Sequence, residues 1–343
     1  MKERLEKLLI TAFEKQASDV HLTVGVRPVF RVNGELIQCE EESLTPDMTS
    51  QMARAIMPED MWELFESKGE IDFSYGIPGV SRFRVNVYFQ RSCISLAIRI
   101  VPTSIPTLDD LNMPDVLKTI ARKPQGLVLV TGPTGSGKST TLAAMVNHMN
   151  THMKRHIITL EDPIEYLHKH GNSIIDQREV GFDTKNFANG LRATLRQDPD
   201  VILVGEMRDL ETIATAVTAA ETGHLVLGTL HTTDAANTIE RIIDVFPPEQ
   251  QGQIRIQLAS VLTAVVSQRL IKTSNGRGRV AATEILLNNS AIKNLIRTEK
   301  IFQIPTVLQT SRAQGMQTLE MNVNDLLRDG KINREAASLY ISR

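Results

Sequence analysis

One short glycine-rich segment has residue types and spacing suited to binding a chain of phosphates. Residues 132–139 read Gly-Pro-Thr-Gly-Ser-Gly-Lys-Ser and match the pattern G-x-x-x-x-G-K-[ST] at every fixed position. The apolar run Leu127–Val130 precedes the segment and a helix is expected from about Ser139 to Met149, which is the strand–loop–helix context that such a loop needs. Its glycines let backbone N–H groups turn towards phosphates, and the helix N-terminus adds positive potential. We therefore interpret the segment as a phosphate-binding loop.

Two side chains of the loop could act directly on a nucleoside triphosphate. Lys138 could reach the β- and γ-phosphates, and the Ser139 hydroxyl could hold Mg²⁺. ATP and Mg²⁺ are therefore the expected cofactors. The predicted nucleotide-binding set consists of the loop and two further residues: Gly132, Pro133, Thr134, Gly135, Ser136, Gly137, Lys138, Ser139, Thr140 and His231.

A glutamate follows one of the predicted buried strands. The strand Val201–Val204 ends in Gly205 and Glu206. Because generic P-loop ATPases have an aspartate at the position of Gly205, Mg²⁺ is expected to depend more on Ser139 and water. Glu206 is suited to orient and polarise the attacking water. We predict Glu206 as a catalytic residue and, with Ser139, as a metal ligand.

A second acidic cluster follows the strand Ile157–Leu160. Its residues are Glu161, Asp162 and Glu165. These carboxylates could hold metal-bound water or assist the catalytic base, and Glu161 is the member expected nearest the nucleotide. A solvated acidic turn remains the alternative interpretation.

A histidine and several arginines complete the predicted site. His231 ends an apolar strand and could sense the γ-phosphate through Glu206 or water, although a structural hydrogen bond would explain it as well. Arg82 and Arg84 share one face of a predicted strand and could therefore form an anion site. A P-loop enzyme usually needs extra positive charge at the transferring phosphate, where an arginine finger can raise the rate by about 10³–10⁵. The alternatives are a basic solvent-facing strand, or a role for Arg192 and Arg196 in the second domain.

The elements that position these residues indicate two domains. A chain of 343 residues is too long for one ordinary core. Residues 1–100 predict a small α+β domain, with a hairpin at Asn33-Gly34. Residues 101–115 predict a linker. Residues 116–343 alternate buried strands with helices, which indicates an α/β domain with a mostly parallel sheet, and the chain beyond Ile254 reads as mainly helical.

Composition limits the possible partners. Hydrophobic residues make up 41% and charged residues 23% of the chain, and the formal net charge is −2. This charge argues against a nucleic-acid partner. Two cysteines cannot make a four-cysteine zinc site. No apolar run approaches the roughly 18–20 residues of a membrane span, so any membrane association is expected to come through a partner.

Four segments, in this order, resemble the Walker A, Asp box, Walker B and His box of the secretion-type ATPases. In that family the glycine at position 205 is normal. Residues 291–297, Ala-Ile-Lys-Asn-Leu-Ile-Arg, are similar to a C-terminal motif of the branch that retracts type IV pili, with departures at Lys293 and Thr298. The four segments are residues 132–139, 161–165, 191–209 and 222–234.

This resemblance implies a PAS-like N-terminal domain, a RecA-like P-loop ATPase domain and a homohexameric ring. It implies that N-domain arginines reach the phosphates; Arg84 and Arg99 match best, and Arg82 and Arg91 less well. It also implies a cytoplasmic motor, peripheral at the inner face of the cytoplasmic membrane, that acts on an inner-membrane pilus platform protein.

Three alternatives remain at this stage. One is the assembly, secretion or competence ATPase of the same superfamily, although such chains commonly have an extra N-terminal domain and often a four-cysteine site. Another is a RecA-like nucleic-acid motor, which the charge and the 4% aromatic content disfavour. The third is a nucleotide-gated scaffold without turnover, which Glu206 and the full phosphate loop disfavour.

Overall fold

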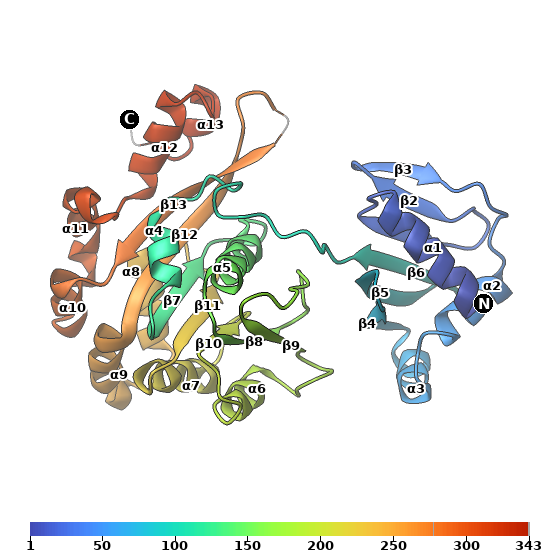
Figure 1. Cartoon of the computed structure of the whole chain (residues 1–343), viewed down its shortest axis with the longest axis horizontal. Helices are drawn as coiled ribbons and strands as arrows, with labels where there is room; N and C mark the ends of the chain where they lie inside the picture. The colour runs from blue at the N-terminus through green and yellow to red at the C-terminus, as the bar shows by residue number, and fades with distance from the viewer. Residues whose placement is uncertain (277, 342–343) are drawn as a thin grey trace. The chain divides into compact units, whose positions relative to one another are not determined.

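The computed structural model describes residues 1–276 and 278–341, and the chain divides into two compact units (Figure 1). Unit 1 consists of Met1–Ser104 together with Glu165–Leu167. Unit 2 consists of Ile105–Ile164 and His168–Arg343. The division after Ser104 falls inside the segment predicted as a linker.

Unit 1 is built on a six-stranded antiparallel sheet with the order β3-β2-β1-β6-β5-β4. The predicted hairpin is confirmed, because Val32 pairs with Glu35 across a turn in which Asn33 and Gly34 both have positive φ, as a type I′ turn requires. The elements are α1 (Lys2–Glu14), β1 (Asp19–Leu22), β2 (Val29–Val32), β3 (Glu35–Gln38), α2 (Pro46–Arg54), α3 (Glu59–Lys68), β4 (Glu70–Ile77), β5 (Ser81–Gln90) and β6 (Cys93–Ile100).

The two faces of this sheet differ in polarity. On β5, Phe83, Val85 and Val87 are fully buried, whereas Arg84 between them is exposed. The buried face packs in one cluster with the apolar side of α1, which includes Leu5, Leu8 and Leu9. The period-two alternation therefore leaves a polar face on unit 1.

Unit 2 contains a seven-stranded sheet with the order β13-β12-β7-β11-β10-β8-β9. All neighbouring strands are parallel except β12 and β13, which are antiparallel. Together with unit 1 this confirms the predicted α/β class with a smaller α+β domain. The strands are β7 (Gly126–Thr131), β8 (His156–Glu161), β9 (Ile174–Glu179), β10 (Val201–Val204), β11 (Leu225–Leu230), β12 (Leu262–Lys272) and β13 (Arg279–Leu287).

The prediction of a mainly helical chain beyond Ile254 was wrong for Leu262–Lys272 and Arg279–Leu287, which form β12 and β13. Leu262–Lys272 is buried along most of its length, so it lacks the two-residue alternation by which a strand is recognised, and a continuous apolar run is ambiguous between helix and strand. Strand β9 was missed as well, because its polar sequence carries no apolar alternation.

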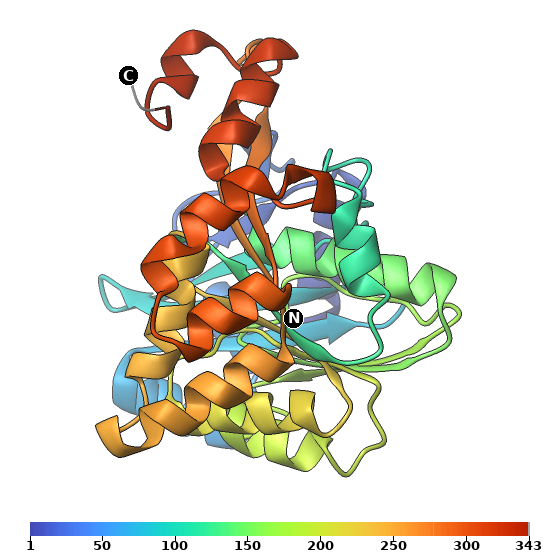
Figure 2. The same ribbon diagram turned by 90° about the vertical axis from the view of Figure 1, so that its left-hand side faces the viewer.

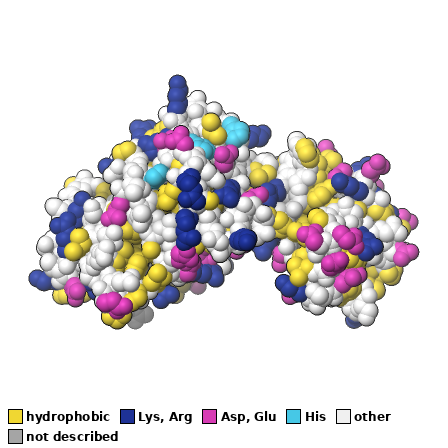
Figure 3. All heavy atoms as spheres, turned by 90° about the horizontal axis from the view of Figure 1, so that it is seen from below, with side chains coloured by type: hydrophobic (Ala, Val, Ile, Leu, Met, Phe, Trp, Pro, Cys, Tyr) yellow, Lys and Arg dark blue, Asp and Glu magenta, His cyan; other side chains and the backbone are white. Residues whose placement is uncertain are grey.

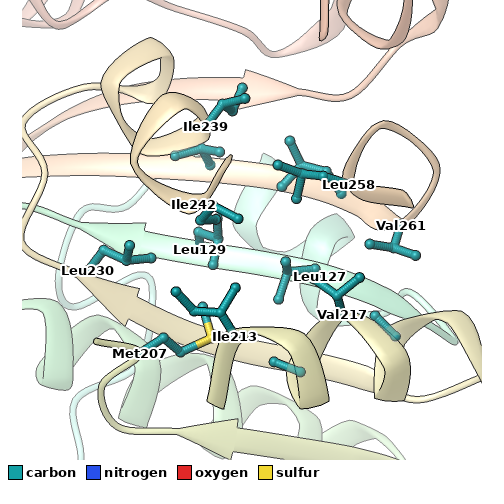
Figure 4. Close-up of a cluster of buried hydrophobic side chains, with 14 of the residues drawn as sticks. Leu127, Leu129, Met207, Ile213, Val217, Leu230, Ile239, Ile242, Leu258 and Val261 are labelled. Carbon is teal, nitrogen blue, oxygen red and sulfur yellow. The ribbon is translucent and has the colours of Figure 1, made fainter. Parts of the chain in front are cut away.

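Helices cover both faces of the unit 2 sheet. On one face, Leu127 and Leu129 of β7 share a cluster with Ile213 of α7 and Leu258 of α9 (Figure 4). On the other face, the intervening Val128 belongs to the cluster that includes α5. The helices are α4 (Val116–Ala121), α5 (Lys138–His152), α6 (Phe187–Thr194), α7 (Leu210–Glu221), α8 (Ala235–Asp244), α9 (Pro248–Val261), α10 (Ser290–Arg297), α11 (Ile304–Thr310), α12 (Leu319–Arg328) and α13 (Arg334–Ala337).

The C-terminal helices α10–α13 follow the β12–β13 hairpin (Figure 2). Ile271 and Val280 of the hairpin pack in a small separate cluster with Val323 and Leu326 of α12. Within the described part of the chain, no helix combines the length and the apolar character needed to cross a bilayer.

Candidate nucleotide site

The carboxyl ends of three neighbouring strands bring the predicted site residues of unit 2 to one edge of the sheet. Strand β11 lies between β7 and β10 (Figure 1). Its last residue, Leu230, pairs with Thr131 of β7, and Gly228 pairs with Val204 of β10. The phosphate loop, His231 and Glu206 each follow one of these ends. Ligands of open parallel sheets bind at this edge.

The phosphate loop has the backbone conformation that its glycines predict. Gly132, Gly135 and Gly137 all have positive φ, which glycine adopts without steric cost. A Cβ on Gly132 would lie 2.5 Å from the carbonyl oxygen of Gln268, so no larger residue fits there. The loop tip, Pro133–Gly135, is exposed, whereas Ser136 is 3% exposed.

Lys138 is directed into the loop. Its Nζ donates to the carbonyl oxygens of Gly132 at 2.8 Å and Pro133 at 3.2 Å. Ser139 and Thr140 follow in the first turn of α5 and are half-buried. The Lys138 ammonium and the N-terminus of α5 therefore lie together at the loop, an arrangement suited to an anion.

Glu206 lies in a set of ionic contacts. Its Oε1 is 2.9 Å from Nε2 of His231, and it forms an ion pair with Arg208. The hydrogen bond to Glu206 raises the pKa of Arg208. These residues and Arg241 line a cleft of about 370 Å³. The predicted link between His231 and Glu206 is thus present as a direct contact.

Sequence reasoning did not single out Arg208 or Arg241. Arg208 was detectable, since it is two residues beyond Glu206. Arg241 lies on α8, far from Glu206 in the sequence, and only the folded chain brings the two residues to the same cleft.

The structure explains why glycine follows β10. A Cβ on Gly205 would lie 3.0 Å from the carbonyl oxygen of Leu160 and 3.3 Å from Cα of Glu161. The backbone N–H of Gly205 also donates to the Leu160 oxygen at 2.8 Å. An aspartate at this position would therefore need the two strand ends to move apart by a few tenths of an ångström.

We expect Gly205→Asp to destabilise unit 2 rather than to supply a metal ligand. Overpacking costs about 1–3 kcal/mol, and the new carboxylate would stand beside Glu161. Thermal unfolding should show a midpoint lower by about 2–4 °C per kcal/mol. Gly252→Asp is the matched control, because a Cβ there meets nothing within 4 Å. An unchanged midpoint for Gly205→Asp would contradict the steric explanation.

Glu161, the last residue of β8, is held by two side chains. Its Oε1 accepts from Thr159 Oγ1 at 2.6 Å and from Gln177 Nε2 at 3.1 Å. Glu161 is next to Gly205 across the β8–β10 pairing. The carboxylate is therefore oriented by the fold, in contrast to a freely solvated acidic turn. Asp162 and Glu165 lie beyond the strand end.

Arg84 and Arg99 are direct partners across β5 and β6, on the polar face of unit 1. Arg84 is 3.8 Å from Asp72, and Arg99 Nε is 3.0 Å from Asp19 Oδ1. Their side chains are 44% and 68% exposed, which leaves both available to an anionic ligand.

Arg192, one of the two arginines considered as alternatives in the second domain, is paired with Glu211 of α7. This ion pair gives Arg192 a structural partner within unit 2.

A second cleft, of about 650 Å³, opens beside the phosphate loop. Gly137, Thr140 and Leu270 line it, together with the segment 110–113. Its volume falls within the range of about 300–1,000 Å³ that is usual for small-molecule pockets.

The donor set suits Mg²⁺ only in company with a nucleotide. Among the residues that the structure describes, no group of three or more His, Cys, Asp or Glu side chains could hold a metal alone. Mg²⁺ ordinarily uses one or two protein oxygens plus phosphate oxygens and water. Ser139 at the end of the loop and Glu206 beyond β10, the second strand from β7 in the sheet, supply side-chain oxygens of that kind.

Comparison with known proteins agrees with this geometry. The Type II/IV secretion system protein family model matches residues 1–337. The chain is 48% identical over 333 residues to the type IV pilus retraction ATPase PilT of Pseudomonas aeruginosa, covering 97% of this chain and 96% of that protein. It is 49% identical over 310 residues to a twitching motility protein of Neisseria gonorrhoeae, covering 90% and 83% respectively.

A solved structure shows the same similarity to pilus retraction ATPases. The pilus retraction motor PilT with bound ADP matches with a TM-score of 0.88 and 49% identity, over 97% of this chain and 95% of that chain. The chain therefore belongs to the Type II/IV secretion system protein family, and it is a P-loop ATPase similar to the pilus retraction motors of that family.

Proposed function

We propose that this chain hydrolyses ATP to power the retraction and disassembly of type IV pili, the process behind twitching motility. The observation that supports it best is the shared edge of the unit 2 sheet, where the phosphate loop, His231 and Glu206 follow adjacent strands. The identity to PilT over nearly the whole of both chains supports retraction as the work that is done.

Each residue of the site has a distinct role in this proposal. The loop amides and Lys138 bind the β- and γ-phosphates, and Thr140 contacts the phosphate nearest the ribose. Glu206 orients the attacking water and accepts its proton, while His231 holds the Glu206 carboxylate at 2.9 Å. Glu161 assists from the neighbouring strand. The cleft beside Gly137 accommodates the adenosine part of the nucleotide.

Mg²⁺ completes the proposed site, with Ser139 and Glu206 as its protein ligands. When bound, the ion neutralises charge that develops on the phosphates. The tight packing at Gly205 is consistent with a carboxylate supplied by Glu206 instead.

Arg84 and Arg99 are proposed to bring positive charge to the transferring phosphate, as the resemblance to secretion ATPases implies. We also propose a homohexameric ring located in the cytoplasm and peripheral at the inner face of the cytoplasmic membrane. There it acts on an inner-membrane pilus platform protein, and membrane contact is made through that partner.

No nucleic-acid partner is proposed. Basic and acidic side chains are interspersed on the face seen in Figure 3, and the net charge is −2. A nucleic-acid motor would instead need a basic surface that follows the backbone.

We expect Arg84→Ala to lower the turnover number by on the order of 10²–10³, as removal of one charge-stabilising donor does. The unfolding midpoint should stay unchanged, because exposed ion pairs such as Arg84–Asp72 contribute little stability. Arg27→Ala, an exposed arginine of the same unit, is the control. Unchanged kinetics in Arg84→Ala would leave Arg84 as an ordinary solvent-facing residue.

Deletion of the gene in its host tests the proposed direction of the motor. Surface pili should accumulate and twitching should stop, and the wild-type gene, but not a Lys138→Ala copy, should restore both. Loss of pili would indicate an assembly ATPase instead. ATP hydrolysis that depends on added DNA would indicate a nucleic-acid motor.

A further inference from the structure

Gln268 is a buried polar side chain that touches the phosphate loop from a distant part of the sequence. It is 1% exposed. It belongs to β12, which pairs in parallel with β7, and Ser267 is the partner of Thr131. Gln268 is therefore the first residue of β12 beyond the point where β7 gives way to the loop.

The Gln268 amide makes two hydrogen bonds with the loop and its helix. Its Nε2 donates to the carbonyl oxygen of Ser136 at 2.6 Å. Its Oε1 accepts from Thr141 Oγ1 at 3.0 Å. Only one amide orientation satisfies both bonds, because the Ser136 carbonyl can accept but cannot donate. The Ser136 carbonyl thus fixes which end of the amide faces the loop, and the hydroxyl of Thr141, which is 2% exposed, holds the other end.

The first of these bonds sets the direction of one loop N–H group. The carbonyl of Ser136 and the N–H of Gly137 belong to the same planar trans peptide unit, so they point in opposite directions. With the carbonyl held towards Gln268, the Gly137 N–H is turned away from β12. A buried carbonyl also needs a donor, and Gln268 provides it.

Gly137 is the residue that makes this close approach feasible. It has a φ of 88°, and a Cβ on it would lie 3.1 Å from Gln268 Nε2. The glycine therefore serves the contact with Gln268 as well as the turn of the loop.

We propose that Gln268 is a positioning residue for ATP hydrolysis, which holds the Ser136–Gly137 peptide so that the Gly137 N–H points at the nucleotide phosphates. Thr141 holds the other end of the Gln268 amide through its hydroxyl. The inference rests on the proposed nucleotide site. It differs from a purely structural role, in which Gln268 would only satisfy a buried carbonyl and would leave the affinity of the folded protein unchanged.

The test replaces Gln268 by methionine, which has a similar length and cannot form either hydrogen bond. The full chain is used, and calorimetry gives the Kd for MgADP while steady-state assays give the KM for ATP. We expect both constants to rise about tenfold, the effect of losing roughly one charge-assisted hydrogen bond. An MgADP Kd within twofold of the wild-type value, measured well below the unfolding midpoint, would overturn the proposal.

Two further variants separate positioning from stability. Thr283→Val is the matched control, since Thr283 is 1% exposed and is the cross-strand partner of Gln268 on β13. It bonds to Gln317 and not to the loop. We expect this variant to lower the unfolding midpoint and to keep the wild-type MgADP affinity. An equal loss of affinity in Thr283→Val would show that the effect is a general loss of stability.

Substitutions of Thr141 test the orientation of the Gln268 amide. Thr141→Ser keeps the hydroxyl and should keep the affinity, whereas Thr141→Val should weaken MgADP binding in the same direction as Gln268→Met. Equal affinities for these two variants would contradict the assigned role of the hydroxyl. Failure of the wild-type chain to bind MgADP would refute the nucleotide site itself, which is a different outcome from an unaffected Gln268→Met variant.

Discussion

Lys138→Ala is expected to abolish measurable ATP turnover, with a loss on the order of 10³-fold. The Lys138 ammonium is held at 2.8 Å and 3.2 Å from two carbonyl oxygens of the loop, which places a full positive charge where the phosphates bind. Removing a single donor at a developing charge typically costs 10²–10³ in rate. Lys138 also contributes its charge to ground-state binding, so the MgATP affinity should fall as well.

The measurement is phosphate release by the purified full chain, with the MgATP affinity followed by calorimetry. Lys154→Ala is the control, because Lys154 is an exposed lysine just beyond the same helix and its removal should leave turnover unchanged. Circular dichroism should show the same helix and strand content in both variants. Turnover near the wild-type rate in Lys138→Ala would refute the assigned phosphate site.

Local patterns were sufficient to predict the parts of the site that lie on consecutive residues. The loop 132–139 was predicted with both flanking elements, since its glycines and Lys138 form a contiguous motif. Glu206 and His231 were predicted from their positions at the ends of apolar strands. A link between them, through Glu206 or water, was one of two roles that the sequence allowed for His231, beside a structural hydrogen bond.

The same reasoning failed where the information lies in long-range packing. The sequence pattern predicts helix where β12 lies, because burial on both faces removes the alternation that identifies a strand. The contact of Gln268 with the phosphate loop could not be predicted either, since its hydrogen bond to Ser136 joins residues 132 positions apart. Arg241 reaches the cleft of Glu206 by the same kind of long-range placement.

Glu206→Gln is expected to separate nucleotide binding from hydrolysis. The amide keeps the size of the side chain and can still accept a hydrogen bond from His231, which lies 2.9 Å from Oε1 in the wild-type chain. It cannot take a proton from water. General-base catalysis contributes about 10²–10⁴ in rate, so the turnover number should fall by that factor, while the Kd for MgATP stays within a few-fold.

Glu161→Gln is the informative comparison for this experiment, since Glu161 is the nearest rival for the same role. Glu206 follows β10, which is nearer to β7 and its phosphate loop in the strand order than β8, the strand that carries Glu161. We therefore expect a smaller loss of turnover in Glu161→Gln than in Glu206→Gln. The reverse ranking would transfer the role of base to Glu161, and it would leave the Glu206–His231 pair as a sensor of bound phosphate. In either case the base belongs to the edge formed by β8, β10 and β11, because both glutamates lie at the carboxyl ends of neighbouring parallel strands of the sheet that carries the phosphate loop.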